Sequence, residues 1–270
     1  MIRAENVYFR YGNGKTVLRD INAEFRNGRI YGLLGMNGSG KTTLLKLLAG
    51  LLFPRQGRVT MDGNDIPARG IGTLMEIFLM QSGFRFGRTS LKQFLRLHSG
   101  FYPHFSMDIL EDCLRETGLG MDIPDLDRIS LGEKQKVMSA IAIASGTGFL
   151  LMDEPSEGMD IPSRKTFRKL LLRHLKEKQT AVISTHHVEE LSDILSDIVI
   201  LGSNGDIAFA GSVEDISERF AFGTSRSAEG ALYSEPCPEG YRIIRRNDSG
   251  ESGEMNLEML FNAAIKGKLQ

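Results

Sequence analysis

The sequence has few of the features that mark secreted proteins with disulfides, proteins with structural metal sites, or nucleic-acid-binding proteins. Its 270 residues include only two cysteines, Cys113 and Cys237, which are too few for a disulfide framework and lack the spacing of metal ligands. The formal net charge is −1, which argues against a broad electrostatic attraction to nucleic acid. We therefore expect a protein of a reducing compartment with no nucleic-acid partner.

Long apolar runs are also missing. No stretch approaches the roughly 18 uninterrupted apolar residues of a membrane span, and the most apolar region, residues 140–152, is interrupted by Ser145, Gly146, Thr147 and Gly148. The N-terminal segment MIRAENVYFRYG has no apolar core and does not resemble a signal peptide. With 41% hydrophobic and 25% charged residues, the composition is typical of a soluble globular protein that does not cross the membrane itself.

Residues 35–43 read Gly-Met-Asn-Gly-Ser-Gly-Lys-Thr-Thr and fit the pattern G-x-x-x-x-G-K-[ST]. An apolar strand at 29–34 precedes the pattern and a leucine-rich helix at 43–52 follows it, so backbone N–H groups would face one point. The glycines let the backbone approach phosphate oxygens without a Cβ clash. The pattern predicts binding of a nucleoside triphosphate, with Lys41 reaching the β- and γ-phosphates and Thr42 ligating Mg²⁺.

Strand and helix patterns alternate along the chain, which indicates an α/β protein with a parallel sheet. Ile109, Leu110, Cys113 and Leu114 share one helical face behind an N-cap at Ser106. Expected strands fall at residues 7–9, 21–25, 29–34, 58–61, 149–152, 181–184 and 198–201. Expected helices fall within residues 90–145, at 163–177, and near 257–265 after a weakly patterned segment from about 221.

The apolar segment at 149–152 ends in two carboxylates, Asp153 and Glu154. Taken alone, the pattern is loose enough that a strand ending at an exposed acidic turn explains it equally well. Downstream of a phosphate loop, it instead predicts that Asp153 holds Mg²⁺, directly or through water, and that Glu154 orients and deprotonates the attacking water.

Residues 129–136 read Ile-Ser-Leu-Gly-Glu-Lys-Gln-Lys and open a predicted helix that continues through Ala144. Ser130 and Glu133 have the spacing of a capping box, so an ordinary helix N-terminus is one explanation. A capped helix start with a hydroxyl and a free N–H is also a phosphate-binding surface, and both explanations can hold together.

With these pieces in this order, residues 1–215 resemble the ATP-binding-cassette (ABC) ATPases. Tyr11 stands where the family stacks an aromatic ring on adenine, and Gln81 matches the switch glutamine that senses Mg²⁺ and the membrane partner. The other matching elements are the phosphate loop, the signature at 129–133, residues 153–160 with the magnesium aspartate and catalytic glutamate, and residues 184–186 with the switch histidine.

The resemblance implies the P-loop ABC-ATPase fold, with a mixed sheet core, an antiparallel β region and a helical subdomain at about 84–145. The ATPase domain would span residues 1–220, and residues 221–270 would form a C-terminal extension of unknown role. The implied catalytic residues are Glu154, His186 and Lys41, and the implied Mg²⁺ ligands are Thr42, Gln81 and Asp153. The implied ATP-binding residues are Tyr11, Gly35, Asn37, Gly38, Ser39, Gly40, Lys41, Thr42 and Thr43.

The resemblance also implies partners. In a head-to-tail homodimer, Ser130, Gly132 and Glu133 of one subunit would cover the ATP that is bound to the other. A separate membrane-spanning permease would lie nearest to Gln81 and the helical region, which would place the chain in the cytoplasm, peripheral on the inner face of the cell membrane.

The signature departs from the family's usual form, because Leu131 replaces the first glycine and Glu133 replaces glutamine. This Ser-Leu-Gly form resembles a subset of exporter ATPases for drugs and peptide antibiotics, and so implies export. Glu133 adds negative charge where a triphosphate would dock. Only one of the adjacent His186 and His187 can point at the phosphate from a strand end, since strand neighbours point to opposite faces. Register with the family favours His186 as the γ-phosphate contact.

Two other functions stay open. A non-transport ABC ATPase that serves the ribosome or DNA repair usually has two cassettes or a long coiled coil, whereas this chain has room for one cassette and shows no heptad run. A weakly catalytic binding module is disfavoured because Lys41, Asp153, Glu154 and His186 are all present.

Overall fold

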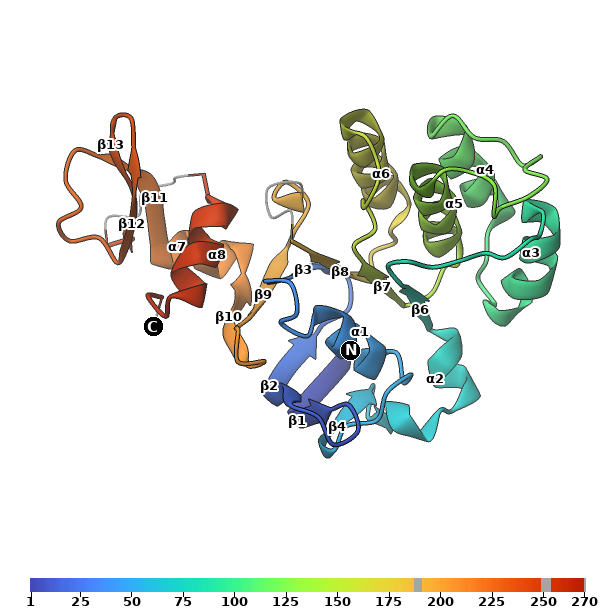
Figure 1. The fold of residues 1–270 in the computed structure, drawn as a ribbon, viewed down its shortest axis with the longest axis horizontal. Coiled ribbons are helices and arrows are strands. Elements are labelled where there is room, and N and C mark those ends of the chain that lie inside the picture. Colours follow the sequence, from blue (N-terminus) through green and yellow to red (C-terminus); the bar gives the residue numbers. More distant parts are fainter. Residues whose placement is uncertain (187–190, 249–253, 270) are drawn as a thin grey trace.

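A six-stranded sheet forms the centre of the computed structural model, which describes residues 1–186, 191–248 and 254–269 (Figure 1). Neighbouring strands within it run parallel except at one edge, where β10 pairs antiparallel with β9. The strand order is β10 (Ile207–Ser212), β9 (Asp197–Leu201), β3 (Ile30–Gly35), β8 (Thr180–Thr185), β7 (Phe149–Asp153) and β6 (Ile77–Met80).

The strands predicted at 149–152, 181–184 and 198–201 are confirmed as β7, β8 and β9. Every residue of β3, β7 and β8 is buried, which is the pattern of parallel strands that are covered on both faces. The carboxyl ends of parallel strands meet at one edge of a sheet, and polar residues placed there lie close together.

An antiparallel sheet packs below the central one, as the family resemblance implies (Figure 1). Its order is β2 (Thr16–Phe25), β1 (Ile2–Arg10), β4 (Gln56–Met61) and β5 (Asn64–Asp65). Helix α1 (Lys41–Leu48) joins the two sheets, because its buried leucines belong to one apolar cluster with both. The helix ends short of the predicted residue 52, at a turn where Gly50 takes a left-handed φ of +68°.

The helical region predicted between residues 90 and 145 forms three helices at one side of the sheet, with a fourth beside them (Figure 1). They are α3 (Leu91–His98), α4 (Met107–Glu116), α5 (Leu131–Ala144) and α6 (Ile161–His174). The predicted N-cap is confirmed, since the Ser106 hydroxyl accepts a hydrogen bond from the Ile109 N–H at 3.3 Å. Leu110, Cys113 and Leu114 are buried as expected.

The C-terminal module, residues 213–248 and 254–269, is more regular than the sequence indicates. It contains α7 (Val213–Arg219), a three-stranded antiparallel sheet in the order β11 (Phe220–Ser225), β13 (Gly240–Arg246) and β12 (Tyr233–Cys237), and α8 (Leu257–Ile265). The expectation of a weakly patterned segment is therefore wrong for this sheet, whereas the helix at 257–265 is confirmed. The predicted boundary after residue 220 falls inside β11, so the division into two domains stays a prediction.

Helix α8 joins this module to the central sheet. It packs against β9 and β10, and Leu257 and Leu260 belong to the same apolar cluster as Ile198 and Ile200. Among the described residues, no helix has both the length and the apolar character that crossing a membrane requires.

Candidate nucleotide-binding and hydrolysis site

The phosphate loop connects the end of β3 to the start of α1. Gly38 and Gly40 have φ values of +81° and +105°, which lie in the region that favours glycine. A Cβ atom on Gly40 would also lie 2.7 Å from the Leu18 side chain. No side chain caps α1, so its first backbone N–H groups are left for an anion such as a phosphate.

The Ser39 hydroxyl is buried behind the phosphate loop. Within the described part of the chain, its oxygen has no hydrogen-bond partner, although buried polar atoms in native proteins are normally paired. A Cβ atom on Gly35 would lie 2.4 Å from this oxygen, and Ser39 does not line the cavity described below. The neighbouring residues Gly38 and Gly40 of the loop do line it.

The Lys41 ammonium group already points into the loop. It donates hydrogen bonds to the Gly35 carbonyl at 2.8 Å and to the Met36 carbonyl at 3.4 Å. Burial lowers the pKa of Lys41 below its usual value, while the carboxylates of Glu154 and Asp153 act in the opposite direction. A buried cation beside this loop is suited to bind phosphate oxygens, whose charge would offset its desolvation.

The Asp153 carboxylate lies at the end of β7 and is held on both sides. Its two oxygens accept hydrogen bonds from the Thr42 hydroxyl at 2.7 Å and from the Ser184 hydroxyl at 2.5 Å. Asp153 is directly opposite Ser184 in the parallel pairing of β7 and β8, which explains the second contact. The structure therefore brings the predicted residues Thr42 and Asp153 together.

These oxygen atoms have the chemistry of a magnesium site. Mg²⁺ prefers hard oxygen ligands and is usually held by one or two protein side chains together with substrate phosphates. Thr42 and Asp153 provide such a pair beside the phosphate loop. Gln81 follows β6, the strand next to β7, and so comes to the same sheet edge without lining the cavity described below.

Glu154 and His186 form the polar pair at the mouth of the site. The His186 Nδ1 atom lies 2.9 Å from a Glu154 carboxylate oxygen. Glu154 has a φ of +48°, a left-handed conformation that is unusual for glutamate. Its N–H donates to the Ser184 carbonyl at 3.1 Å, which helps to hold the turn. His187 lies outside the described residues.

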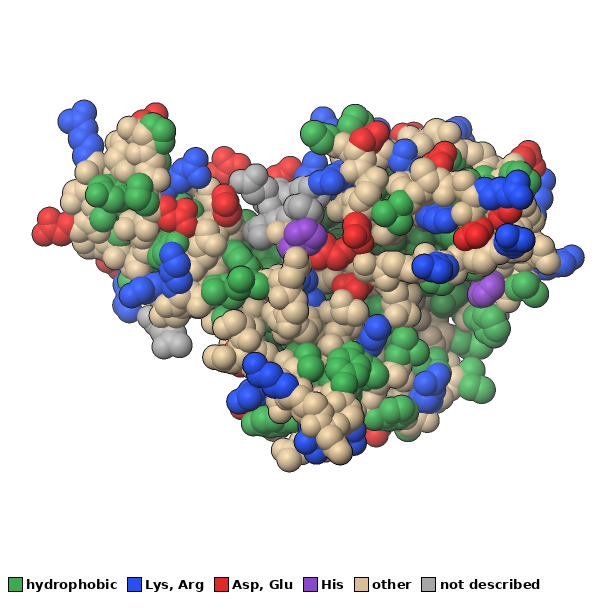
Figure 2. All heavy atoms as spheres, in the orientation of Figure 1, with side chains coloured by type: hydrophobic (Ala, Val, Ile, Leu, Met, Phe, Trp, Pro, Cys, Tyr) green, Lys and Arg blue, Asp and Glu red, His purple; other side chains and the backbone are tan. Residues whose placement is uncertain are grey.

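A cavity of about 380 Å³ is lined by residues of the phosphate loop together with Asp153, Glu154 and His186. Figure 2 shows acidic side chains gathered beside a histidine near the middle of this face of the molecule. The residues that line the cavity are Val17, Asn37, Gly38, Gly40, Lys41, Thr42, Thr43, Ser82, Asp153, Glu154, Glu157 and His186. A single cavity thus joins a phosphate-binding loop, a cation, a pair of oxygen ligands and a carboxylate suited to act as a base.

Tyr11 lies beside the phosphate loop rather than in the cavity. Its hydroxyl is 3.1 Å from the Thr43 hydroxyl, and its ring meets Phe9 edge-on at 4.9 Å. The side chain is 50% exposed, so one part of the aromatic ring is available to a flat ligand that extends from the loop.

The signature residues lie away from the cavity of their own chain. Ser130 caps α5, and the capping box is present: the Glu133 carboxylate accepts from the Ser130 N–H and hydroxyl, each at 2.8 Å. These hydrogen bonds lower the pKa of Glu133. Gly132 packs against the loop after Glu154, where a Cβ would come within 2.7 Å of the Gly158 carbonyl oxygen. Ser130, Gly132 and Glu133 do not line the cavity.

Sequence reasoning missed four side chains of this site, of which Val17 supplies an apolar part of the cavity lining. The Ser82 hydroxyl donates to the Glu157 carboxylate at 2.9 Å, which closes one wall of the cavity, and Ser184 holds Asp153. Only the parallel register of β7 with β8 would have found Ser184. No local pattern marks Ser82 and Glu157 as a pair, because 75 positions separate them.

The chain is similar to known proteins. A protein-family model described as "ABC transporter" matches residues 18–157. The energy-coupling factor transporter ATP-binding protein EcfA1 of Thermotoga maritima is 37% identical over 232 residues, which cover 81% of this chain and 84% of that protein. The sulfate/thiosulfate import ATP-binding protein CysA of Synechocystis is 34% identical over 225 residues, 79% of this chain and 61% of that protein.

A solved structure of the ATP-binding subunit of an ABC transporter aligns with a TM-score of 0.72. The alignment has 24% sequence identity and covers 80% of this chain and 91% of that one, so it shows a common fold. Together with the family model and the relatives, these similarities show that the chain belongs to the ABC transporter family, as an ATP-binding and ATP-hydrolysing subunit.

Proposed function

We propose that this chain is the motor of a membrane transporter, which binds ATP with Mg²⁺ in the described cavity and uses hydrolysis to drive a separate permease. The observation that carries the proposal is the Glu154–His186 pair, 2.9 Å apart in the cavity that also holds Lys41, Thr42 and Asp153. This set provides anion binding, oxygen ligands and a positioned base in one place.

The residues divide the reaction between them. The loop N–H groups, that of Ser39 among them, and Lys41 would hold the phosphates, and Tyr11 would stack on the adenine. Glu154 would orient a water molecule and take its proton as the water oxygen bonds to the γ-phosphorus and the bond to ADP breaks. His186 would hold the Glu154 carboxylate and contact the γ-phosphate.

Thr42, Asp153 and Gln81 would hold Mg²⁺. The ion, when bound, neutralises charge on the phosphate oxygens during phosphoryl transfer.

A second copy of the chain would complete the site. Ser130, Gly132 and Glu133 do not line the cavity of their own subunit, although the family resemblance assigns them to ATP. A head-to-tail dimer would account for both facts, because the start of α5 in one subunit would then close the cavity of the other.

An apolar groove on the surface of the chain supports the proposal of a membrane partner. It lies between β6, α3 and α5, has a volume of about 150 Å³, and is lined mostly by aromatic and aliphatic side chains, among them Leu79, Phe84, Phe101 and Tyr102. Phe101 is 62% exposed at this groove, and apolar side chains that gather in one place on a surface mark interaction sites. A cytoplasmic segment of the permease would cover it and would hold the chain at the inner face of the cell membrane.

Strand β6 connects this groove to the nucleotide. Leu79 lines the groove, Gln81 follows at the end of the strand, and Ser82 lines the nucleotide cavity. The direction of transport rests on the Ser130-Leu131-Gly132 form of the signature, which resembles exporters, and we propose export.

Two measurements test the proposal. A purified chain that shows no Mg²⁺-dependent ATP hydrolysis would contradict the proposed role as a motor.

The membrane partner is tested separately. Affinity purification from membranes should recover a protein with about six apolar spans of ~20 residues each. Phe101→Asp should lose that protein and keep basal ATPase activity, whereas Leu172→Asp, at a 53% exposed position on α6, should keep both. Equal recovery in the two variants would exclude the groove as the docking site.

A further inference from the structure

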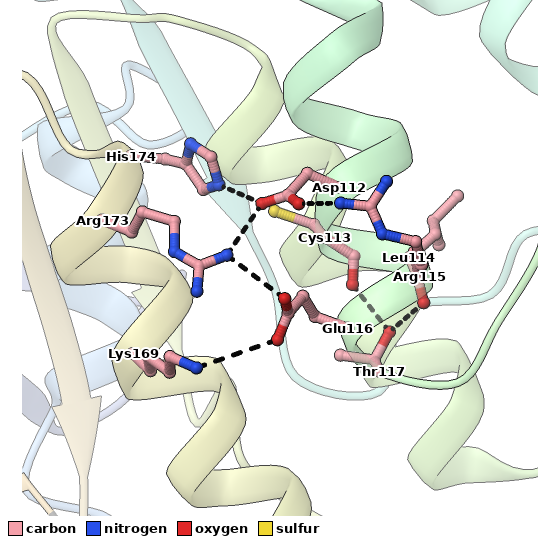
Figure 3. A network of polar contacts seen from close by, with 9 residues as sticks. All are labelled: Asp112, Cys113, Leu114, Arg115, Glu116, Thr117, Lys169, Arg173 and His174. Carbon is pink, nitrogen blue, oxygen red and sulfur yellow. Dashed lines mark hydrogen bonds and ion pairs between the residues drawn. The ribbon is translucent and has the colours of Figure 1, made fainter.

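A cluster of charged side chains joins the last turns of α4 and α6, outside the nucleotide site (Figure 3). The Asp112 carboxylate accepts hydrogen bonds from His174 Nε2 at 2.8 Å and from the Arg173 guanidinium at 3.1 Å. Arg115, one turn along α4, also donates to it. The Asp112 and His174 side chains are only 19% and 16% exposed, so water screens this contact less than an ordinary surface ion pair.

A second carboxylate extends the cluster along the same helix face. Glu116 lies four residues after Asp112 and pairs with Arg173 at 3.4 Å and with Lys169 at 3.9 Å. The hydrogen bond from His174 is the main cause that lowers the pKa of Asp112, followed by Arg173, while burial acts against it. The Cys113 thiol lies next to Asp112, and burial raises its pKa to about 12.

The two helices lead to the two surfaces that one chain would contribute to the composite ATP sites of a dimer. Helix α6 is capped by Asp160, at the end of the loop that carries Glu154 and Glu157. Helix α4 packs against α5, whose N-cap is Ser130. Over its 14 residues, α6 spans about 21 Å, so it connects the cluster to the hydrolysis loop as one rigid rod.

The remaining attachments of the helical region are less restrictive. Its N-terminal connection contains Gly83 and Gly87, both at positive φ with open space around them. Helix α5 also packs on α6 and β6, but mainly through apolar side chains, and apolar contact is not directional. Directional contacts fix one arrangement of packed helices, and the Asp112 cluster supplies them between α4 and α6.

We propose that the Asp112–Arg173–His174 contact is a latch that sets the position of the Ser130 helix relative to the Glu154 loop, and so controls closure of the composite ATP site. This inference rests on the proposed function, because the Ser130 helix is taken to cover ATP on a second copy. The latch touches no nucleotide, so its residues are positioning residues.

Asp112→Asn in a Glu154→Gln background tests the latch. Nucleotide binding by the single chain, measured with a fluorescent ATP analogue, should be unchanged, since no cavity residue is altered. ATP-dependent dimerisation, measured by analytical ultracentrifugation, should weaken by about fivefold or more, the usual lower range for coupled sites. The matched control is Arg115→Gln, which removes a partner of Asp112 on the same helix and should leave dimerisation unchanged.

A distance measurement separates the latch from a general loss of structure. Spin labels on cysteines placed at the exposed positions Leu97 and Leu51, with Cys237 replaced by serine, report the helical region relative to the core. Asp112→Asn should broaden the distance distribution, and Arg115→Gln should not. An unchanged distribution, or equal dimerisation in Asp112→Asn and its parent, would overturn the latch. A parent that binds ATP without dimerising would instead contradict the composite site in the proposed function.

Discussion

At the scale of single residues, the proposed hydrolysis depends on the position of the Glu154 carboxylate. The Glu154 carboxylate is the base that the geometry offers, and His186 is the group that touches it. We expect Glu154→Gln to keep ATP binding and to lower turnover by on the order of 10²–10⁴-fold, because the side chain keeps its shape and loses its basicity. Steady-state hydrolysis and nucleotide-binding assays measure the two quantities separately, and unchanged turnover would remove Glu154 from the role of base.

His186→Ala should lose most turnover, and His187→Ala should be mild. The reason is that His186 lies against Glu154, and neighbouring side chains of an extended strand are expected on opposite faces. Hydrolysis rates of the two variants, measured side by side, decide this. An equal loss in both would contradict the assignment.

Glu133 has two opposing effects at the start of α5. As the second half of the capping box, it stabilises the helix by roughly 0.5–2 kcal/mol. As a carboxylate beside a docking triphosphate, it would oppose closure. Glu133→Gln keeps a capping side chain without the charge, so ATP-dependent dimerisation in a Glu154→Gln background should strengthen, with little change in Tm. The gain should shrink at high salt, because screening weakens the repulsion. A weaker dimer would show that the carboxylate has another task.

At the scale of elements, the start of α5 packs closely on the loop after Glu154. A Cβ on Gly132 would come within 2.7 Å of the Gly158 carbonyl, so Gly132→Ala must shift one backbone against the other. We expect a lower Tm and reduced ATPase activity. Gly72→Ala is the control: it places the same methyl group in helix α2 (Ile71–Met75), where nothing lies within 4 Å. Comparable losses in both variants would mean that the close contact is not the cause.

The sequence predicted those elements that carry local signals. The phosphate loop, the Ser106 and Ser130 caps and the apolar strand before Asp153 each depend on residues a few positions apart, and all of these elements are present. Contacts set by strand register, such as Ser184 with Asp153, could not be predicted because they join distant segments. The sheet of β11, β13 and β12 was missed because its central strand does not alternate between apolar and polar residues. In β13, the buried Ile243 and Ile244 are adjacent and have exposed arginines on both sides, which breaks the alternation of a half-buried strand.

At the scale of the whole molecule, the C-terminal module is packed into the cassette rather than tethered to it. Leu260 of α8 is fully buried in the cluster that contains the central sheet. Leu260→Ala should therefore lower the free energy of unfolding by about 2–5 kcal/mol, as large-to-small core changes do. Leu172→Ala, at an exposed position of α6, should stay within about 0.5 kcal/mol. Denaturant unfolding monitored by circular dichroism measures both. A small effect of Leu260→Ala would mean that the module folds and unfolds separately.

We expect the left-handed turn at Glu154 to set activity against stability. In an extended strand, consecutive side chains point to opposite faces, but the φ of +48° turns the chain so that Asp153 and Glu154 both line the cavity. Such a conformation costs about 1–3 kcal/mol for a residue of this type. Asparagine adopts it more readily, so Glu154→Asn should raise Tm by a few degrees while turnover disappears. Glu157→Asn, one turn further along the same loop, should bring no such gain. Glu154 would then be a position at which a substitution that stabilises the fold removes ATP hydrolysis, whereas Glu157 would not.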